Sequence, residues 1–188
     1  MSEVMFESKL RKINSWLILR LPDEASKKLS SRGMVMVEAE LESSLEPSIE
    51  SSRGKVKLKL PLEPDGSGGH WFKFSSEMQK ELKASDGDLI KVKFKQIADW
   101  LEPEVPKDLK DSLDGNPKVN ELWLDITVKA RWEFICWIRS TANPETRKRR
   151  IEVSISKLNS GMRRPCCFNS SMCTEPEVCK NGVLLSLD

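Results

Sequence analysis

The segment Lys55–Leu62 constrains the fold most, because its apolar and polar side chains alternate with a period of two. Val56, Leu58, Leu60 and Leu62 occupy the even positions, and lysine or proline occupies the odd positions. Successive side chains of a β-strand point to opposite faces of the sheet. The segment therefore predicts an amphipathic strand with a row of lysines facing water, and such a strand needs partners.

Further strand signals fill the first 97 residues. Apolar side chains recur at strand-like spacing in five other segments, which are residues 4–13, 15–21, 34–41, 70–74 and 89–97. Pro22 and Ser75 each begin a short helical pattern between them. Six or seven short strands with two short helices close most economically into a small barrel without exposed edges. We therefore expect residues 1–98 to form a β-barrel domain.

The sequence becomes helical after an acidic, proline-containing linker at residues 99–105. Gly115 and Gly161 are helix stops, and Thr127 and Asn143 are N-caps in the predicted module at residues 106–161. Its caps and apolar stripes indicate three to four helices. Residues 162–188 form a cysteine-bearing C-terminal tail, whose apolar end is expected to pack back on the protein, with an added strand at Gly182–Leu187. The predicted fold class is α+β.

One run in the module is distinctive, namely Pro144, Glu145, Thr146 and Arg147 followed by Arg149, Arg150 and Ile151. Together with Val105–Pro106, Asn116–Pro117 and Trp137–Ile138, it resembles the YdeI/OmpD-associated, or bacteriocin-protection, family over residues 104–158. Residues 5–97 resemble a small β-barrel domain of unknown function that often precedes this module. The resemblance implies a bacterial or archaeal protein, an association with resistance to envelope stress and antimicrobial peptides, and no catalytic residue.

The helix beginning at Pro144 carries the strongest basic signal, Arg147, Lys148, Arg149 and Arg150. Arg147 lies four residues before Ile151 and is predicted on or beside the buried face, paired with Glu145, Glu133 or a backbone carbonyl. Two interpretations stay open. One is a structural arginine with a solvated basic face, and the other is a site where these cations and the helix N-terminus bind an anionic partner.

Four of the five cysteines, Cys166, Cys167, Cys173 and Cys179, lie in the tail. We expect a cytoplasmic protein, because the first residues lack signal-peptide features, and cytoplasmic thiols are kept reduced. The sequence then favours free thiols or metal ligands over a disulfide. Zinc ions and iron–sulfur clusters both take thiolate ligands. The spacing of these four cysteines, however, differs from the pairs two to four residues apart that are usual in zinc sites. Redox-active thiols are a further alternative, and otherwise no cofactor is expected.

Bulk charge narrows the function classes. The formal net charge is +2, from 31 basic and 29 acidic residues, which argues against nucleic-acid binding by the whole chain. No apolar run reaches membrane-span length.

His70, the only histidine, begins a strand and is expected to be a surface or loop residue.

The expected function is that of a non-enzymatic, stress-associated protein that uses the basic helix to bind an anionic ligand or an unknown protein partner. The alternatives are a thiol- or metal-dependent redox protein or enzyme that uses the tail cysteines, and a nucleic-acid-binding protein.

Overall fold

The computed structural model describes residues 3–43, 54–165 and 168–186, and they form two compact units. The barrel unit consists of Met1–Asp99, Ser170–Cys173 and Glu177–Asp188. The helical unit consists of Trp100–Asn169 and Thr174–Pro176. The tail is thus shared between the units. The fold class is α+β, as the sequence predicted.

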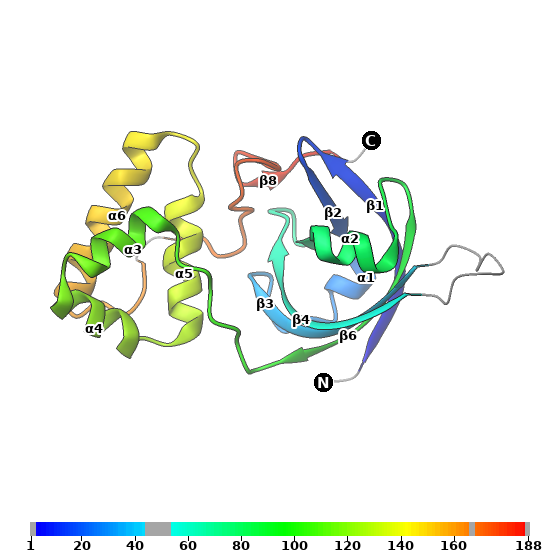
Figure 1. Cartoon of the computed structure of the whole chain (residues 1–188), viewed down its shortest axis with the longest axis horizontal. Coiled ribbons are helices and arrows are strands. Elements are labelled where there is room, and N and C mark those ends of the chain that lie inside the picture. Colours follow the sequence, from blue (N-terminus) through cyan, green and yellow to red (C-terminus); the bar gives the residue numbers. More distant parts are fainter. Residues whose placement is uncertain (1–2, 44–53, 166–167, 187–188) are drawn as a thin grey trace. The chain divides into compact units, whose positions relative to one another are not determined.

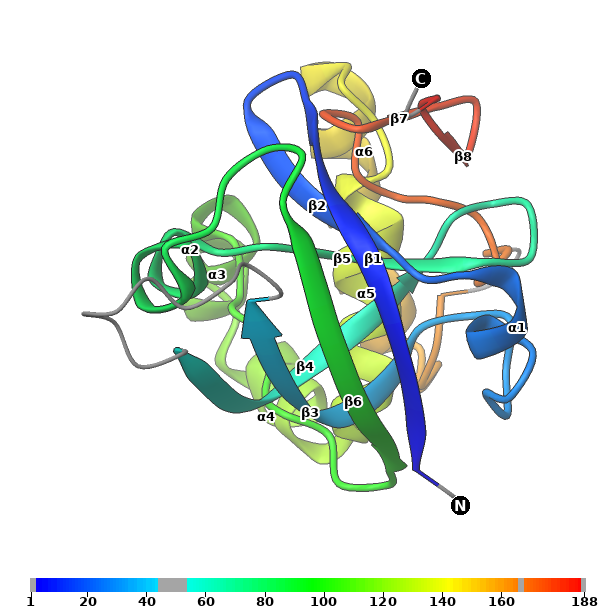
Figure 2. The same ribbon diagram turned by 90° about the vertical axis from the view of Figure 1, so that its right-hand side faces the viewer.

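Six antiparallel strands close the barrel in the order β1-β2-β5-β4-β3-β6 (Figure 1). They are β1 (Val4–Ile13), β2 (Trp16–Arg20), β3 (Val35–Ser43), β4 (Lys55–Pro64), β5 (His70–Lys73) and β6 (Leu89–Ile97). Helices α1 (Asp23–Ser26) and α2 (Ser76–Leu82) follow β2 and β5. The long strands β1 and β6 run side by side and close the wall (Figure 2). The predicted closed barrel with two short helices is confirmed.

The register of β4 explains its alternation. Leu60 pairs with Val37 of β3, and both side chains are buried in the barrel core. On the outer face Lys57 pairs with Glu40, with their charged atoms 3.1 Å apart. The same alternation on β6 places Lys93 opposite Glu40 from the other side. The lysines of β4 and β6 therefore flank a glutamate row on β3 and do not form an unbroken positive stripe.

The helical unit contains α3 (Lys107–Asp114), α4 (Pro117–Asp125), α5 (Val128–Arg139) and α6 (Pro144–Asn159). The predicted caps are confirmed: Thr127 accepts a hydrogen bond from the N–H of Ala130, and Asn143 accepts one from the N–H of Thr146. The apolar faces meet in one core that includes Leu109, Trp123, Phe134, Ile138, Ile151 and Leu158. Within the described ranges, no helix is long and apolar enough to cross a bilayer.

The tail packs back on the barrel, as expected. Strands β7 (Cys179–Lys180) and β8 (Val183–Leu184) form a small hairpin whose turn places Gly182 at a φ of 78°. The N–H of Leu184 donates to the carbonyl of Asp65 at 2.8 Å. The predicted strand at Gly182–Leu187 is therefore shorter, and Leu187 lies outside the described residues.

Candidate functional site

Arg147 is half-buried on α6 and binds Asp108 at the start of α3. Its Nε and Nη2 atoms donate to the two carboxylate oxygens at 2.6 and 3.0 Å. This bidentate geometry is the strong form of the arginine–carboxylate pair. Arg147 also lowers the pKa of the Asp108 carboxyl, chiefly through the hydrogen bond. The predicted pairing exists, but the expected partners Glu145 and Glu133 were wrong, because α3 brings a carboxylate from 39 residues away.

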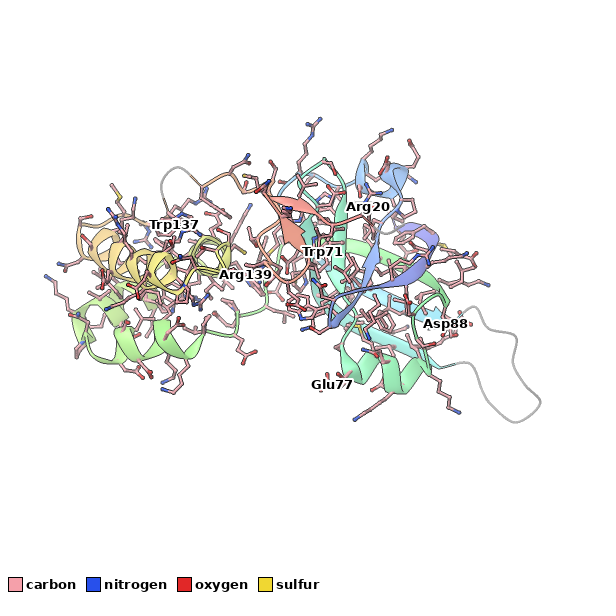
Figure 3. The ribbon with its side chains drawn as sticks, turned by 90° about the horizontal axis from the view of Figure 1, so that it is seen from above. Arg20, Trp71, Glu77, Asp88, Trp137 and Arg139 are labelled. Carbon is pink, nitrogen blue, oxygen red and sulfur yellow. A yellow bond between two sulfur atoms is a disulfide. The ribbon has the colours of Figure 1, made fainter. Side chains whose placement is uncertain are left out.

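Arg150 fixes the C-terminal end of α5. Its Nη1 donates to the carbonyl of Trp137 at 2.6 Å and to the hydroxyl of Ser140 at 2.7 Å. The Arg150 guanidinium also lies 5.6 Å from the centre of the Trp137 ring. Trp137 and Arg139 both lie on the last turn of α5 (Figure 3). A cation near the last carbonyls of a helix compensates their partial negative charge. Arg150 therefore anchors α6 to the end of α5 and does not belong to a solvated basic face.

Lys148 and Arg149 differ from these two arginines. Both side chains are exposed, and neither has a hydrogen-bond or ion-pair partner in the described part of the chain. Glu145 and Glu152 lie one helical turn away on the same exposed helix. The basic run of the sequence thus divides into two anchoring cations, Arg147 and Arg150, and two outward-facing cations.

The two arginines that follow α6 also have acidic partners. Arg163 contacts the Asp125 carboxylate at 2.5 Å, and Arg164 lies 3.5 Å from that of Glu133. Both arginines are well exposed, so each pair contributes little to stability. Asp125 and Glu133 partly compensate the charges of Arg163 and Arg164. Lys148 and Arg149 therefore remain the outward-facing cations of the basic run.

These contacts predict that Arg150→Ala destabilises the protein more than Arg147→Ala does. We expect losses in unfolding free energy of about 2 kcal/mol for Arg150→Ala, which leaves a helix end uncapped, and about 1 kcal/mol for Arg147→Ala. Urea unfolding followed by circular dichroism measures both. Arg149→Ala is the matched control, with a change within about 0.5 kcal/mol. A larger loss for Arg147→Ala would contradict the assignment of Arg150 as the helix cap.

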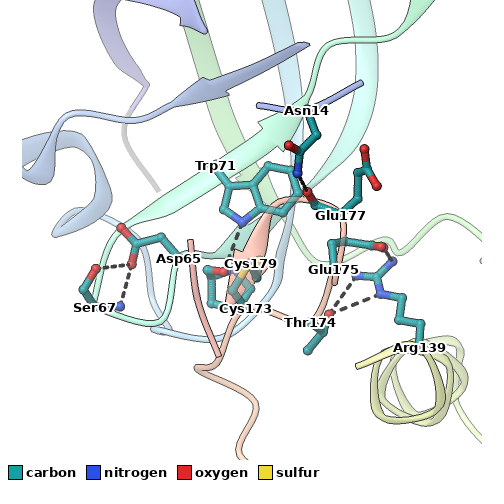
Figure 4. The surroundings of a disulfide bond; sticks show 11 residues. Asn14, Asp65, Ser67, Trp71, Arg139, Cys173, Thr174, Glu175, Glu177 and Cys179 are labelled. Atoms are coloured by element: carbon teal, nitrogen blue, oxygen red, sulfur yellow. Dashed lines mark hydrogen bonds and ion pairs between the residues drawn. A yellow bond between two sulfur atoms is a disulfide. The ribbon is translucent and has the colours of Figure 1, made fainter. Parts of the chain in front are cut away.

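The tail cysteines depart from the sequence prediction. Cys173 and Cys179 form a disulfide with their Cα atoms 6.0 Å apart, so the expectation of free thiols or metal ligands is wrong for this pair (Figure 4). The six-residue separation and the docking of the tail bring the two side chains together. Cys173 is buried in a cluster with Ile13, Ile18 and Trp71 of the barrel unit.

The other three cysteines are Cys136, Cys166 and Cys167. Cys136 is buried on α5 and lies outside the Cys173–Cys179 disulfide. Cys166 and Cys167 lie outside the described residues. Within residues 3–43, 54–165 and 168–186, no group of three or more His, Cys, Asp or Glu side chains is arranged to hold a metal ion. The described part of the tail is therefore organised by a disulfide and by packing.

His70 is buried, with 1% of its surface exposed, so the expectation of a surface or loop histidine was wrong. Its Nε2 lies 3.2 Å from the carbonyl oxygen of Gly33. Its Nδ1 is buried and has no partner among the described residues. Burial lowers the pKa of His70, although the nearby carbonyl of Gly33 and the carboxylate of Asp65 favour the charged form.

This burial predicts a pH-dependent stability. The unfolded chain takes up the histidine proton near pH 6.5, whereas the folded protein does so only at lower pH. Unfolding free energy should therefore be full above pH 6.5 and fall as the pH drops from there towards the folded pKa. Unfolding titrations at several pH values measure this slope. His70→Asn should flatten it, since the chain has no other histidine; an unchanged slope would assign it to carboxylates.

The comparisons with known proteins bear on the helical unit. Residues 102–161 match the family model described as bacteriocin-protection, YdeI or OmpD-associated. The resemblance of the module to this family is therefore confirmed, over a segment that contains α3 to α6. No curated protein matches the chain.

Proposed function

We propose that the chain is a non-catalytic binding protein with a protection-related role, and that its helical unit contacts an anionic partner through Lys148 and Arg149. The observation that carries the proposal is the division of the basic run on α6. Arg147 and Arg150 face inward and have partners, whereas Lys148 and Arg149 face solvent without one in the described part. The family description supplies the protection-related role.

The anchoring arginines support this role because they hold the helix in one orientation. Arg147 ties α6 to α3, and Arg150 ties it to the end of α5. The helix backbone that carries the exposed cations therefore needs little reordering when a partner binds, which lowers the entropic cost of association. The neighbouring Glu145 and Glu152 weaken any long-range attraction, so the expected contact is short-ranged and sensitive to the positions of the two cations.

The proposed role involves contact and no bond chemistry. The charged side chains that α6 presents to solvent are Lys148 and Arg149 together with Glu145 and Glu152, and they suit recognition by charge. Arg163 and Arg164 have acidic partners, and the lysines of the barrel flank glutamates. Both observations favour a small anionic surface on a partner over a long nucleic-acid backbone, which needs a continuous positive track.

The test is binding of the full chain to polyglutamate, used as an acidic polypeptide probe. The double variant Lys148→Gln, Arg149→Gln should weaken binding about fivefold or more, since it removes both exposed cations. The double variant Lys80→Gln, Lys118→Gln changes the net charge equally at exposed positions elsewhere. Equal losses for the two double variants would show attraction by net charge alone and reject the proposal for this helix.

Cytoplasmic location is part of the sequence-based proposal and can be tested by cell fractionation. The Cys173–Cys179 disulfide bears on this question, because disulfides persist mainly in oxidising compartments. Thiol labelling of freshly lysed cells would measure the fraction of the pair that is reduced. A fully oxidised pair in the native host would argue for a location outside the reducing cytoplasm.

A further inference from the structure

We propose that the barrel unit contains a separate binding cleft for a phosphate group carried by a small molecule. The cleft has a volume of about 560 Å³ and opens between the segment that includes α1 and the loop that joins β4 to β5. Its polar lining includes three cations, Arg20, Lys27 and Arg32, and a set of serine hydroxyls, Ser26, Ser31 and Ser67. The proposal is independent of the helical unit.

Asp65 gives the loop wall of the cleft its shape. It is almost completely buried, and its Oδ1 accepts hydrogen bonds from the N–H groups of Ser67 and Gly69, each at 2.8 Å. Burial by itself raises the pKa of the Asp65 carboxyl, but these N–H groups and the Arg20 guanidinium hold the pKa below its usual value. The carboxylate therefore stays ionised and keeps the loop folded over the cleft.

Close backbone approaches restrict the same loop. A Cβ atom on Gly69 would collide with the Asp65 carboxylate, and one on Gly66 would collide with the carbonyl oxygen of Gly182 in the tail. The tail thus packs against the loop from outside. Only residues without a side chain fit at these two positions. The hydrogen bonds from Ser67 and Gly69 to Asp65 hold the loop in this conformation, which lowers the reorganisation that ligand binding requires.

Two carboxylates hold the Arg20 side chain at the end of β2. It extends from β2 (Figure 3), and its Nε donates to Asp65 at 3.0 Å while its Nη2 contacts Asp23 at 3.2 Å. Its Nη1 makes no hydrogen bond within the described part of the chain. These contacts fix the plane of the guanidinium and leave one of its nitrogen atoms available to a ligand.

The other cations give the cleft its charge. Arg32 is exposed and has no hydrogen-bond or ion-pair partner in the ranges that the structure describes. The Lys27 ammonium pairs with the exposed Glu24, and solvent screens this pair. Asp23 is the one acidic side chain of the lining and is 71% exposed. Arg20 and Lys27 contact carboxylates, so Arg32 supplies the uncompensated positive charge of the lining, and this charge favours an anion.

The donor set indicates which anion. Guanidinium groups present several N–H donors in a plane that matches the oxygen atoms of phosphate. The hydroxyls of Ser26 and Ser31 add single donors, whereas the Ser67 hydroxyl already donates to Asp65 at 3.1 Å. The cleft is large enough for more than the phosphate group alone. We therefore assign it to a phosphate monoester whose remaining part occupies the open side of the cleft.

Binding of glycerol 3-phosphate and of inorganic phosphate to the full chain tests the assignment. Two-dimensional amide NMR should show saturable shifts at Ser31, Ser67, Gly68 and Gly69, with tighter binding of the ester. Arg32→Ala should weaken binding about tenfold, because it removes a charged donor. Lys80→Ala, an exposed lysine on α2, is the control and should leave affinity unchanged.

A second variant separates folding from binding. Arg20→Lys keeps the charge and removes the planar fork, so the barrel should remain folded by circular dichroism while affinity falls. Absence of saturable shifts, or equal losses for Arg32→Ala and Lys80→Ala, would overturn the assignment. The Lys148→Gln, Arg149→Gln variant should bind the phosphate ester normally; loss of binding there would place the phosphate site on α6.

Discussion

Replacing Arg131 by alanine is expected to destabilise the helical unit by about 3 kcal/mol. Arg131 is 8% exposed, and its Nη1 donates to the carbonyls of Trp123, Leu124 and Ile126 at 2.9 to 3.2 Å. Trp123 and Leu124 lie in the last turn of α4 and Ile126 is its C-cap residue, so these carbonyls have no donors within the helix. Removing the guanidinium leaves buried acceptors without donors, and it also deletes the packing of the side-chain stem.

The partner of Arg131 provides a matched control. Glu102 accepts hydrogen bonds from the Nε and Nη2 atoms of Arg131 at 3.0 and 2.5 Å, but its side chain is 64% exposed. Glu102→Gln should therefore cost less than about 1 kcal/mol, since water can replace the lost charge interaction. Thermal and urea unfolding followed at 222 nm measure both variants. Similar losses for Arg131→Ala and Glu102→Gln would mean that the ion pair, and not the helix end, is what Arg131 stabilises.

The parts of the fold that the sequence predicted are those determined by neighbouring residues. The alternation in Lys55–Leu62 requires only the two-residue period of a strand, and the caps at Thr127 and Asn143 require only contacts three residues away. Closure of the barrel followed from the number of strands and the cost of open edges. Each of these inferences uses local geometry, which the order of residues carries directly.

The partners of the arginines are determined differently. Arg147 meets Asp108 and Arg150 meets the Trp137 carbonyl because α6 packs against α3 and α5 at particular rotations. One residue along a helix turns a side chain by about 100°, so a small error in packing phase exchanges a buried cation for an exposed one. Arg131 lies four residues after the Thr127 cap, within an apolar helix, and an arginine in such a position is a signal for a buried partner.

The barrel cleft and the disulfide also depend on long-range contacts. Arg20 and Asp65 are 45 residues apart in the sequence, so their contact cannot be inferred from neighbouring residues. The signal for a built loop was present, since an aspartate followed by Gly-Ser-Gly-Gly can accept hydrogen bonds from its own backbone. The disulfide forms where the docked tail brings Cys173 and Cys179 together, and the spacing of the cysteines in the sequence does not show this docking.

Replacing Trp71 by alanine is expected to have the largest effect in the barrel unit, a loss of about 3 to 5 kcal/mol in unfolding free energy. The Trp71 side chain is completely buried and shares a cluster with Ile13 and Ile18 of the barrel and with Val178 of the tail. Its Nε1 donates to the carbonyl of Pro64 at 3.1 Å (Figure 4). The residue therefore joins the barrel wall, the base of the β4–β5 loop and the docked tail.

Two variants separate these contributions. Trp71→Phe keeps most of the apolar surface and removes the N–H donor, so it should cost about 1 to 2 kcal/mol. Trp16→Ala removes a partly buried ring of the same cluster, whose centre lies 6.5 Å from that of Trp71, and should cost less than Trp71→Ala. Trypsin cleavage after Lys180 provides a second measurement, because Lys180 is exposed but held in the β7–β8 hairpin, and undocking of the tail releases this segment. Trp71→Ala should accelerate cleavage in the folded protein, whereas slow cleavage together with a large stability loss would show that the disulfide alone keeps the tail in place.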